Sequence, residues 1–190
     1  MIVIGIDPSF TRTGVSVCEF TESSFSVLDK YSISIPDDLK KAAHGKSVRS
    51  KSDVYDLENT VRSSRWLANI IGKYIDYCKS RFGCVDALAV EYPALATRSG
   101  AYLGFIQQAI YDEVISRFEG ELSVVALPPT ATKSLTKYTT KSELVIWCKS
   151  NFDLSHLKSV NHDEATAMVL SYLFKEVYYK RYKKTYKVYL

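Results

Sequence analysis

The sequence of 190 residues predicts an α/β domain in which helices cover both faces of a mixed five-stranded sheet. Three apolar stretches with short turns open the chain, which is typical of an antiparallel meander. Two later apolar runs of strand length are separated by a segment with helical spacing, the pattern of parallel strands joined by crossover helices. This order places the first strand at the centre of the sheet, with the fourth and fifth strands parallel to it.

The opening meander is expected at residues 1–6, 13–20 and 24–35. The first stretch is rich in β-branched residues, which favour a buried strand. Asp7 ends this run, and the following proline stops it. The third stretch alternates polar and apolar residues, as a half-exposed strand does, and Pro36 breaks it.

The rest of the chain alternates helices and strands within one expected domain over residues 1–190. Residues 37–53 are small, polar and basic without a sustained period, so we expect a long mobile loop there. Residues 178–190 form a basic, tyrosine-rich tail. The other elements are expected as helices at 54–81, 101–118, 142–151 and from 162 onward, and as strands at 85–90 and 122–127.

The composition is that of a soluble globular protein. No apolar run approaches the ~18 residues that span a membrane. An apolar strand is predicted from the first residues, so we expect no signal segment. Its four cysteines are scattered, which argues against a zinc site and for free thiols in a reducing compartment. We therefore expect a cytoplasmic protein.

The formal net charge of +4 is modest, but basic residues crowd the expected loop and tail. Clustered Lys and Arg side chains neutralise phosphates and release counterions, so a polyanion is a plausible partner. The alternative is a solvated surface with a flexible basic tail. The candidates for DNA contact in the loop are Lys40, Lys41, Lys46, Arg49 and Lys51.

Carboxylates stand at the ends of two strands expected to be neighbours. Asp7 and Glu91 each follow such a strand, so they should meet at the carboxyl edge of the sheet, where open α/β sheets bind ligands. Two adjacent carboxylates repel each other, and a divalent cation removes the repulsion. Hard oxygen ligands suit Mg²⁺, with Mn²⁺ able to substitute. The alternative for Asp7 is a residue that merely starts a β-turn.

Further acids, Asp163 and Glu164, open the last expected helix. A helix dipole also favours acids at that end, which is the structural alternative. Gathered with the first two, they would support metal-assisted phosphodiester hydrolysis by two ions roughly 3.5–4 Å apart, one activating a water and the other stabilising the leaving oxygen.

Basic and aromatic side chains near these acids are candidates for DNA contact. Lys133 and Lys141 follow the fifth strand and are candidates to contact the scissile phosphate or stabilise developing charge, or are ordinary surface lysines. Tyr92 and Arg98 follow Glu91 closely. An aromatic ring at this place offers a surface on which an unpaired base stacks.

Several segments together resemble the RuvC-type Holliday junction resolvases of the RNase H-like superfamily. They are Ile4-Gly5-Ile6-Asp7-Pro8-Ser9, Thr13-Gly14, Val90-Glu91, Ala131-Thr132-Lys133 and Asp163-Glu164-Ala165-Thr166-Ala167-Met168. The resemblance covers nearly the whole chain in order and spacing. It implies an RNase H-like fold and a role in DNA recombination and repair. It also implies a homodimer that cuts opposed strands of a four-way DNA junction, using Mg²⁺ held by four acidic residues.

Within that resemblance, Asp7 and Glu91 match the first two family carboxylates, and the last helix is ambiguous. The family places two acids, or a histidine and an acid, three residues apart there. Aligning Asp163 with the first puts Thr166 at the last, and aligning the residue at 161 with the first puts Glu164 at the last. Either alignment lacks one acid. We expect Asp163 and Glu164 both to lie near the metals, with the neighbouring histidine as a helper or a helix-start residue.

Alternative functions stay open. One is an RNase H-like nuclease with broader specificity for flaps, branched DNA or RNA, and another is a catalytically impaired junction-binding protein. An actin-like ATPase shares the opening motif, but this chain lacks a second glycine-rich turn after a strand. One apolar helix face is a candidate dimer seam, although packing on the sheet is the simpler interpretation; it is formed by Leu103, Phe105, Ile106 and Ile110.

Overall fold

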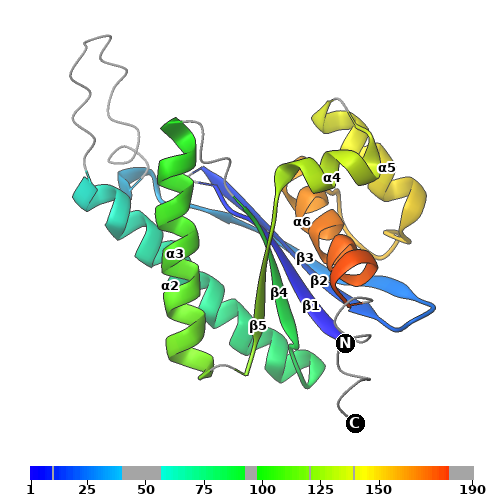
Figure 1. The fold of residues 1–190 in the computed structure, drawn as a ribbon, viewed down its shortest axis with the longest axis horizontal. Coiled ribbons are helices and arrows are strands. Elements are labelled where there is room, and N and C mark those ends of the chain that lie inside the picture. Colours follow the sequence, from blue (N-terminus) through cyan, green and yellow to red (C-terminus); the bar gives the residue numbers. More distant parts are fainter. Residues whose placement is uncertain (10, 40–56, 93–97, 120, 139, 180–190) are drawn as a thin grey trace.

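The computed structural model describes residues 1–9, 11–39, 57–92, 98–119, 121–138 and 140–179. A twisted sheet runs through the middle of the molecule, with helices α2 and α3 on one side and α4, α5 and α6 on the other (Figure 1). This confirms the predicted mixed five-stranded sheet covered on both faces.

The strands lie in the order β3-β2-β1-β4-β5, so the first strand is central, as predicted. Strands β1, β2 and β3 form the antiparallel meander, while β4 and β5 run parallel to β1. The strand bounds are Ile2–Asp7 for β1, Arg12–Phe20 for β2, Phe25–Ser34 for β3, Ala87–Glu91 for β4 and Ser123–Leu127 for β5.

The helices follow the predicted order with one addition. Helix α4 occupies a segment expected to be irregular, and it forms because a proline at its first turn has no amide that needs a partner there. The helical bounds are Leu57–Phe82 for α2, Arg98–Phe118 for α3, Pro129–Thr136 for α4, Lys141–Asn151 for α5, His162–Leu173 for α6 and Phe174–Tyr179 for the π-helical turn η1.

The sheet separates two hydrophobic cores. Ile4 and Ile6 point into the core formed with α2 and α3, whereas Val3 points into the core formed with α5 and α6. Side chains alternate along a strand, so a central strand covered on both faces must be apolar at almost every position. This explains why the opening strand is a continuous apolar run.

Two glycines let α6 lie directly on the sheet. A Cβ atom at Gly5 would overlap the backbone carbonyl of Ala167, and one at Gly14 would overlap the carbonyl of Asp163. A residue without a side chain is needed wherever two backbones approach this closely. The contact at Gly14 fixes the N-terminus of α6 beside the residue that pairs with Asp7 in the sheet.

Two predicted segments fall mostly outside the described residues: most of the loop at 37–53 and most of the tail at 178–190. The single domain over the whole chain therefore stays a prediction. Among the helices that the structure describes, none is long and apolar enough to cross a membrane. The predicted DNA-contacting residues outside the described part are Lys40, Lys41, Lys46, Arg49 and Lys51.

Candidate active site

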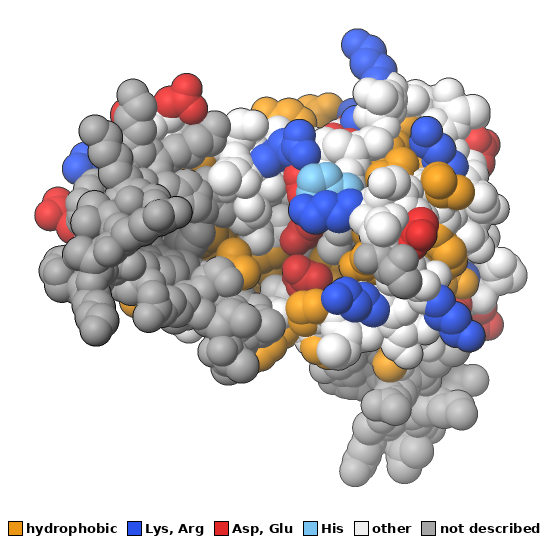
Figure 2. Space-filling model, turned by 90° about the horizontal axis from the view of Figure 1, so that it is seen from above, with side chains coloured by type: hydrophobic (Ala, Val, Ile, Leu, Met, Phe, Trp, Pro, Cys, Tyr) orange, Lys and Arg blue, Asp and Glu red, His pale blue; other side chains and the backbone are white. Residues whose placement is uncertain are grey.

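Asp7 and Glu91 meet at the carboxyl edge of the sheet. Ile6 pairs with Val90 in the parallel register of β1 and β4, so the two acids are the next residues of adjacent strands. Their carboxyl groups are in hydrogen-bond contact and half-buried. Figure 2 views this edge and shows acidic side chains gathered in a depression, with Lys and Arg side chains around it.

The proximity of these acids changes their protonation. Burial raises the pKa of Asp7 well above its ordinary value, and the charges of Glu91 and Asp163 raise this pKa further. Burial also raises the pKa of Glu91, although its contact with Asp7 and the charge of Lys133 oppose that rise. Two carboxylates in contact cannot both ionise cheaply, so the pair retains a proton more readily than an isolated acid does.

Asp163 approaches the pair from α6. Its side chain is 13% exposed, and its Oδ2 lies 2.6 Å from Nε of Arg12. Its Oδ1 lies 2.5 Å from Nε2 of His162. The charge of Asp163 acts on Asp7, so the helix brings a third carboxylate to the cluster.

Glu164 does not join this cluster, in contrast to its expected place near the metals. Its side chain is 4% exposed and lies 2.9 Å from Nζ of Lys30, and it accepts a hydrogen bond from Ser32. It also accepts from the backbone amide of Asn161, whose side chain in turn caps the helix at Glu164. This reciprocal capping box directs Glu164 toward β3, while Asp163, one residue earlier, pairs with Arg12 at the start of β2.

Thr166 contributes a hydroxyl where the family pattern has an acid. Its side chain is in hydrogen-bond contact with Asp7, which lowers the pKa of that acid. The one hydrogen of this hydroxyl also has the carbonyl of His162 within reach, at 2.9 Å, so Asp7 and that carbonyl compete for it. The structure thus follows the alignment in which Asp163 and Thr166 face the site together. The cluster then consists of three carboxylates and one hydroxyl.

Basic and aromatic groups border the carboxylates. The charge of Lys133 on α4 acts on Glu91. Nζ of Lys141 lies 2.8 Å from Nε2 of His162, whose pKa is lowered mainly by burial. Burial raises the pKa of Tyr138, and the charges of Glu91 and Asp7 raise it further.

The other two predicted DNA contacts near the site are Tyr92 and Arg98. The ring of Tyr92 is exposed beside the end of β4. Arg98 begins α3, and the structure describes only its backbone.

Sequence reasoning missed three residues of this neighbourhood: Arg12, Tyr138 and Lys30. Arg12 could have been noticed, since it begins β2 shortly after Asp7 and two residues before Gly14, which pairs with Asp7. Tyr138 follows the unexpected helix α4, and Lys30 lies on β3 with its partner 134 residues away. No local sequence pattern marks either Tyr138 or Lys30 as part of the site.

The donor set suits a divalent ion. Asp7 and Glu91 present hard oxygen ligands, and burial raises the pKa of both, so a divalent cation would stabilise their ionised forms. Within the described ranges, however, no three His, Cys, Asp or Glu side chains are arranged to hold a metal ion. Asp163 is turned to Arg12 and His162, so its participation requires a change of partner.

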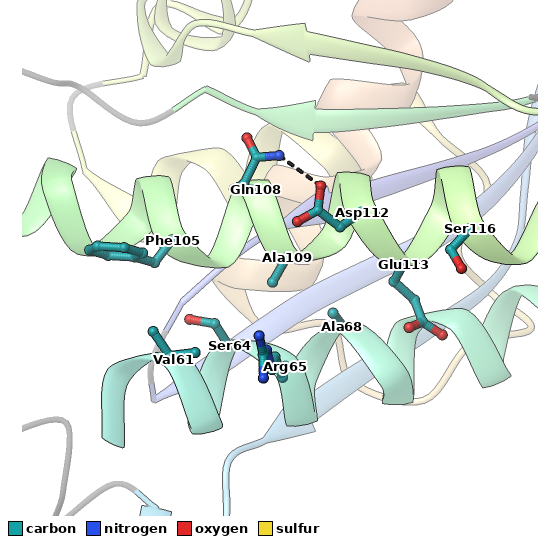
Figure 3. A pocket seen from close by; sticks show the side chains of 10 residues that line it. All are labelled: Val61, Ser64, Arg65, Ala68, Phe105, Gln108, Ala109, Asp112, Glu113 and Ser116. Atoms are coloured by element: carbon teal, nitrogen blue, oxygen red, sulfur yellow. Dashed lines mark hydrogen bonds between the residues drawn. The ribbon is translucent and has the colours of Figure 1, made fainter. Parts of the chain in front are cut away.

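A groove of about 510 Å³ lies between α2 and α3, and none of the clustered carboxylates lines it (Figure 3). Phe105 lines it and is exposed, and it belongs to the expected dimer seam. Ile106 and Ile110 of that seam are fully buried in the core against the sheet. Packing on the sheet therefore accounts for those two residues.

Comparisons with known proteins support the fold. No protein-family model matches the chain, and no curated protein sequence does. Among solved structures, RuvC of Thermus thermophilus is similar with a TM-score of 0.61, 18% identity, and coverage of 96% of this chain and 97% of that one. RuvC of the same organism in complex with a Holliday junction substrate has a TM-score of 0.60 at 18% identity, with coverage of 95% of both chains. The yeast mitochondrial Holliday junction resolvase Ydc2 has a TM-score of 0.56 at 12% identity, with coverage of 99% and 84%.

Proposed function

We propose that this protein is a divalent-metal-dependent endonuclease that cleaves DNA at four-way or other branched junctions. The observation that carries the proposal is the convergence of Asp7, Glu91 and Asp163 at the carboxyl edge of the sheet. The fold supports it, because similar solved structures include RuvC in complex with a Holliday junction substrate.

The three carboxylates are the groups that would hold Mg²⁺, with Mn²⁺ as a substitute. When bound, a divalent ion supplies an activated water and stabilises the leaving oxygen. Asp7 and Glu91 must both be ionised in that state, so the proton that their contact favours has to leave. Thr166 would support the ionised form of Asp7 by turning its hydroxyl hydrogen from the carbonyl of His162 to that acid. Two ions per site remain a prediction.

The border of the site supports binding of a phosphate backbone. Lys133 stands beside Glu91, where its charge would neutralise a phosphate on the carboxylates. Lys141 reaches the same region through His162. Tyr138 and the exposed Tyr92 offer aromatic surfaces on which an unpaired base at a junction could stack. Arg98 and the basic loop residues remain predicted contacts.

We propose that the active form is a homodimer. The chain has one cluster of these three acids, and cutting two opposed strands of a four-way junction requires two sites. The exposed Phe105, beside the groove between α2 and α3, is the residue of the predicted seam that remains available to a partner. Light scattering of the purified protein, alone and with junction DNA, tests the dimer.

The direct test is cleavage of a synthetic four-way junction, compared with a flap and a linear duplex at one salt concentration. We expect junction cutting with Mg²⁺ and none with EDTA. Asp7→Asn should lower the rate by at least about 100-fold, because loss of even an outer-shell partner of a metal ligand costs 10- to 100-fold. Asp76→Asn is the matched control, since Asp76 lies on α2 in an exposed pair with Arg117.

The outcomes separate the alternatives. Equal rates on all three substrates would favour a nuclease of broader specificity. Tight, salt-sensitive junction binding without cutting in Mg²⁺ or Mn²⁺ would favour a junction-binding protein. Full activity of Asp7→Asn would remove the carboxylate cluster from the mechanism.

A further inference from the structure

We propose that Arg12 exchanges partners as the site is loaded: it neutralises Asp163 in the metal-free protein and binds a DNA phosphate once a divalent ion has taken Asp163. This inference rests on the proposed nuclease function and adds a regulatory residue to it. The observation behind it is the ion pair between Nε of Arg12 and Oδ2 of Asp163, at 2.6 Å.

The two partners of this pair differ in their surroundings. The side chain of Asp163 is 13% exposed, while that of Arg12 is 41% exposed. An acid this buried needs a positive partner, because an ionised carboxylate is costly to remove from water. An arginine this exposed is well solvated without its partner. Arg12 therefore loses little when it leaves the pair, whereas Asp163 then needs another cation in its place.

A divalent ion and Arg12 compete for the same carboxylate. Oδ2 of Asp163 is taken by Arg12, and Oδ1 lies against His162. In this arrangement no three acidic, His or Cys side chains of the described ranges are placed to hold a metal. Two cations on one carboxylate also repel each other, which raises the cost of keeping both. Arg12 must therefore withdraw when Asp163 becomes a ligand.

A phosphate is the natural second partner for the released side chain. Arg12 begins β2 at the sheet edge where Asp7 ends β1, so it stands where the DNA backbone would reach the carboxylates. The guanidinium group is planar and presents several N–H donors that match the oxygens of a phosphate. Only Nε is engaged in the hydrogen bond with Asp163.

The charge of the cluster explains why such an exchange would be useful. Thr166 stands where the family pattern has an acid, and Glu164 is paired with Lys30. Three carboxylates remain, and Arg12 neutralises one of them. A phosphate that draws Arg12 away would increase the negative charge available to the ion. Metal and DNA should then favour each other's binding, and this coupling must be reciprocal.

The test measures Mn²⁺ binding without DNA by electron paramagnetic resonance, in the wild type, Arg12→Gln and Arg81→Gln. Arg81 is the matched control: it is exposed and pairs with Asp29 at 2.9 Å, away from the carboxylates. We expect Arg12→Gln to bind Mn²⁺ roughly 3- to 10-fold more tightly, the range set by partly exposed ion pairs and bonds to charged groups. Arg81→Gln should match the wild type.

The second measurement is binding of an uncleaved four-way junction in Ca²⁺ across a salt series. Arg12→Gln should bind the junction more weakly, and its salt slope should fall by about one phosphate contact. If Arg12 had a purely structural role, Arg12→Gln would not bind Mn²⁺ more tightly while binding the junction more weakly. Arg12→Lys keeps the positive charge but loses the planar guanidinium group. Its Mn²⁺ affinity should therefore lie between that of the wild type and that of Arg12→Gln.

Two failures are distinguishable. If Mn²⁺ binds the wild type and is lost in Asp7→Asn, but Arg12→Gln binds it no more tightly than Arg81→Gln, the exchange is wrong and the nuclease proposal stands. If Mn²⁺ binds neither the wild type nor Arg12→Gln, the metal site itself is wrong.

Discussion

Asp7 and Glu91 occupy consecutive positions of adjacent parallel strands, and their carboxyl groups are in hydrogen-bond contact. No parallel sheet needs two acids there for its own stability. Burial raises the pKa of both acids, and the charge of Glu91 raises the pKa of Asp7 further, so at neutral pH the metal-free fold carries a cost at this edge.

The first prediction is that Asp7→Asn stabilises the metal-free protein. Because the pKa of Asp7 is raised in the folded state, folding favours its protonated form. That stabilisation is complete below the ordinary Asp pKa, about 3.9, and is lost as pH rises through the raised folded-state pKa. Asparagine stays neutral, so its melting temperature in EDTA should exceed that of the wild type by a few degrees at pH 7–8.

Thermal melts across pH 4–8 test whether Asp7→Asn is more stable than the wild type and how this difference changes with pH. The gap between Asp7→Asn and the wild type should shrink as pH falls, whereas Asp76→Asn should show no such gap. A variant that is less stable than the wild type at pH 8 would show that Asp7 serves the fold.

The second prediction separates two neighbouring acids. Asp163→Asn should weaken Mn²⁺ binding, while Glu164→Gln should leave it nearly unchanged, since Glu164 faces Lys30 and Ser32. Lys30→Met should lower the free energy of unfolding by about 3 kcal/mol, as expected when one partner of a buried pair is removed. Calorimetric titration and urea unfolding measure the two effects. Loss of Mn²⁺ binding in a folded Glu164→Gln protein would return Glu164 to the metal site.

The third prediction concerns the contact that positions α6. Gly14→Ala should destabilise the protein by roughly 1–3 kcal/mol or more, because its Cβ would overlap the carbonyl of Asp163. Cleavage should fall as well, since Asp163 would move. Gly104→Ala is the control: its Cβ meets open space within α3, and alanine favours a helix by up to about 1 kcal/mol. Equal stabilities of the two variants in urea would contradict the close approach.

The fourth prediction assigns Lys133 to the phosphate backbone. Lys133→Ala should reduce junction cleavage by roughly tenfold or more and lower the salt slope of DNA binding by about one. Lys149→Ala, an exposed lysine in the last turn of α5, should change neither. Filter binding in Ca²⁺ over a salt series measures the slope. An unchanged slope in Lys133→Ala would leave that lysine without a role in binding.

Much of the fold could be predicted because its signals are local. The apolar run of β1 ends at Asp7 and that of β4 ends at Glu91, and strand order alone brings those ends together. Helix α4 was not predicted because it is only eight residues long and mostly polar. Its start is marked by Pro129 rather than by apolar spacing.

The orientation of the last helix could not be predicted from its composition. Asp163 and Glu164 are adjacent acids, and which one faces the sheet edge depends on the rotation of α6. That rotation is set by the contact at Gly14 and by the capping network of Asn161 and Lys30. The contacts of Gly14 with Asp163 and of Lys30 with Glu164 join residues more than a hundred positions apart, so no local pattern reveals them. Arg12 lies close to Asp7 in the sequence, but its partner Asp163 is 151 positions away.

The most direct test of the central claim is anomalous diffraction from a crystal of the protein soaked in Mn²⁺. We expect at least one Mn²⁺ peak bonded to carboxylate oxygens of Asp7, Glu91 and Asp163, with Glu164 still on Lys30. A crystal that shows full Mn²⁺ occupancy elsewhere and none between these three carboxylates would contradict the proposed metal-dependent nuclease.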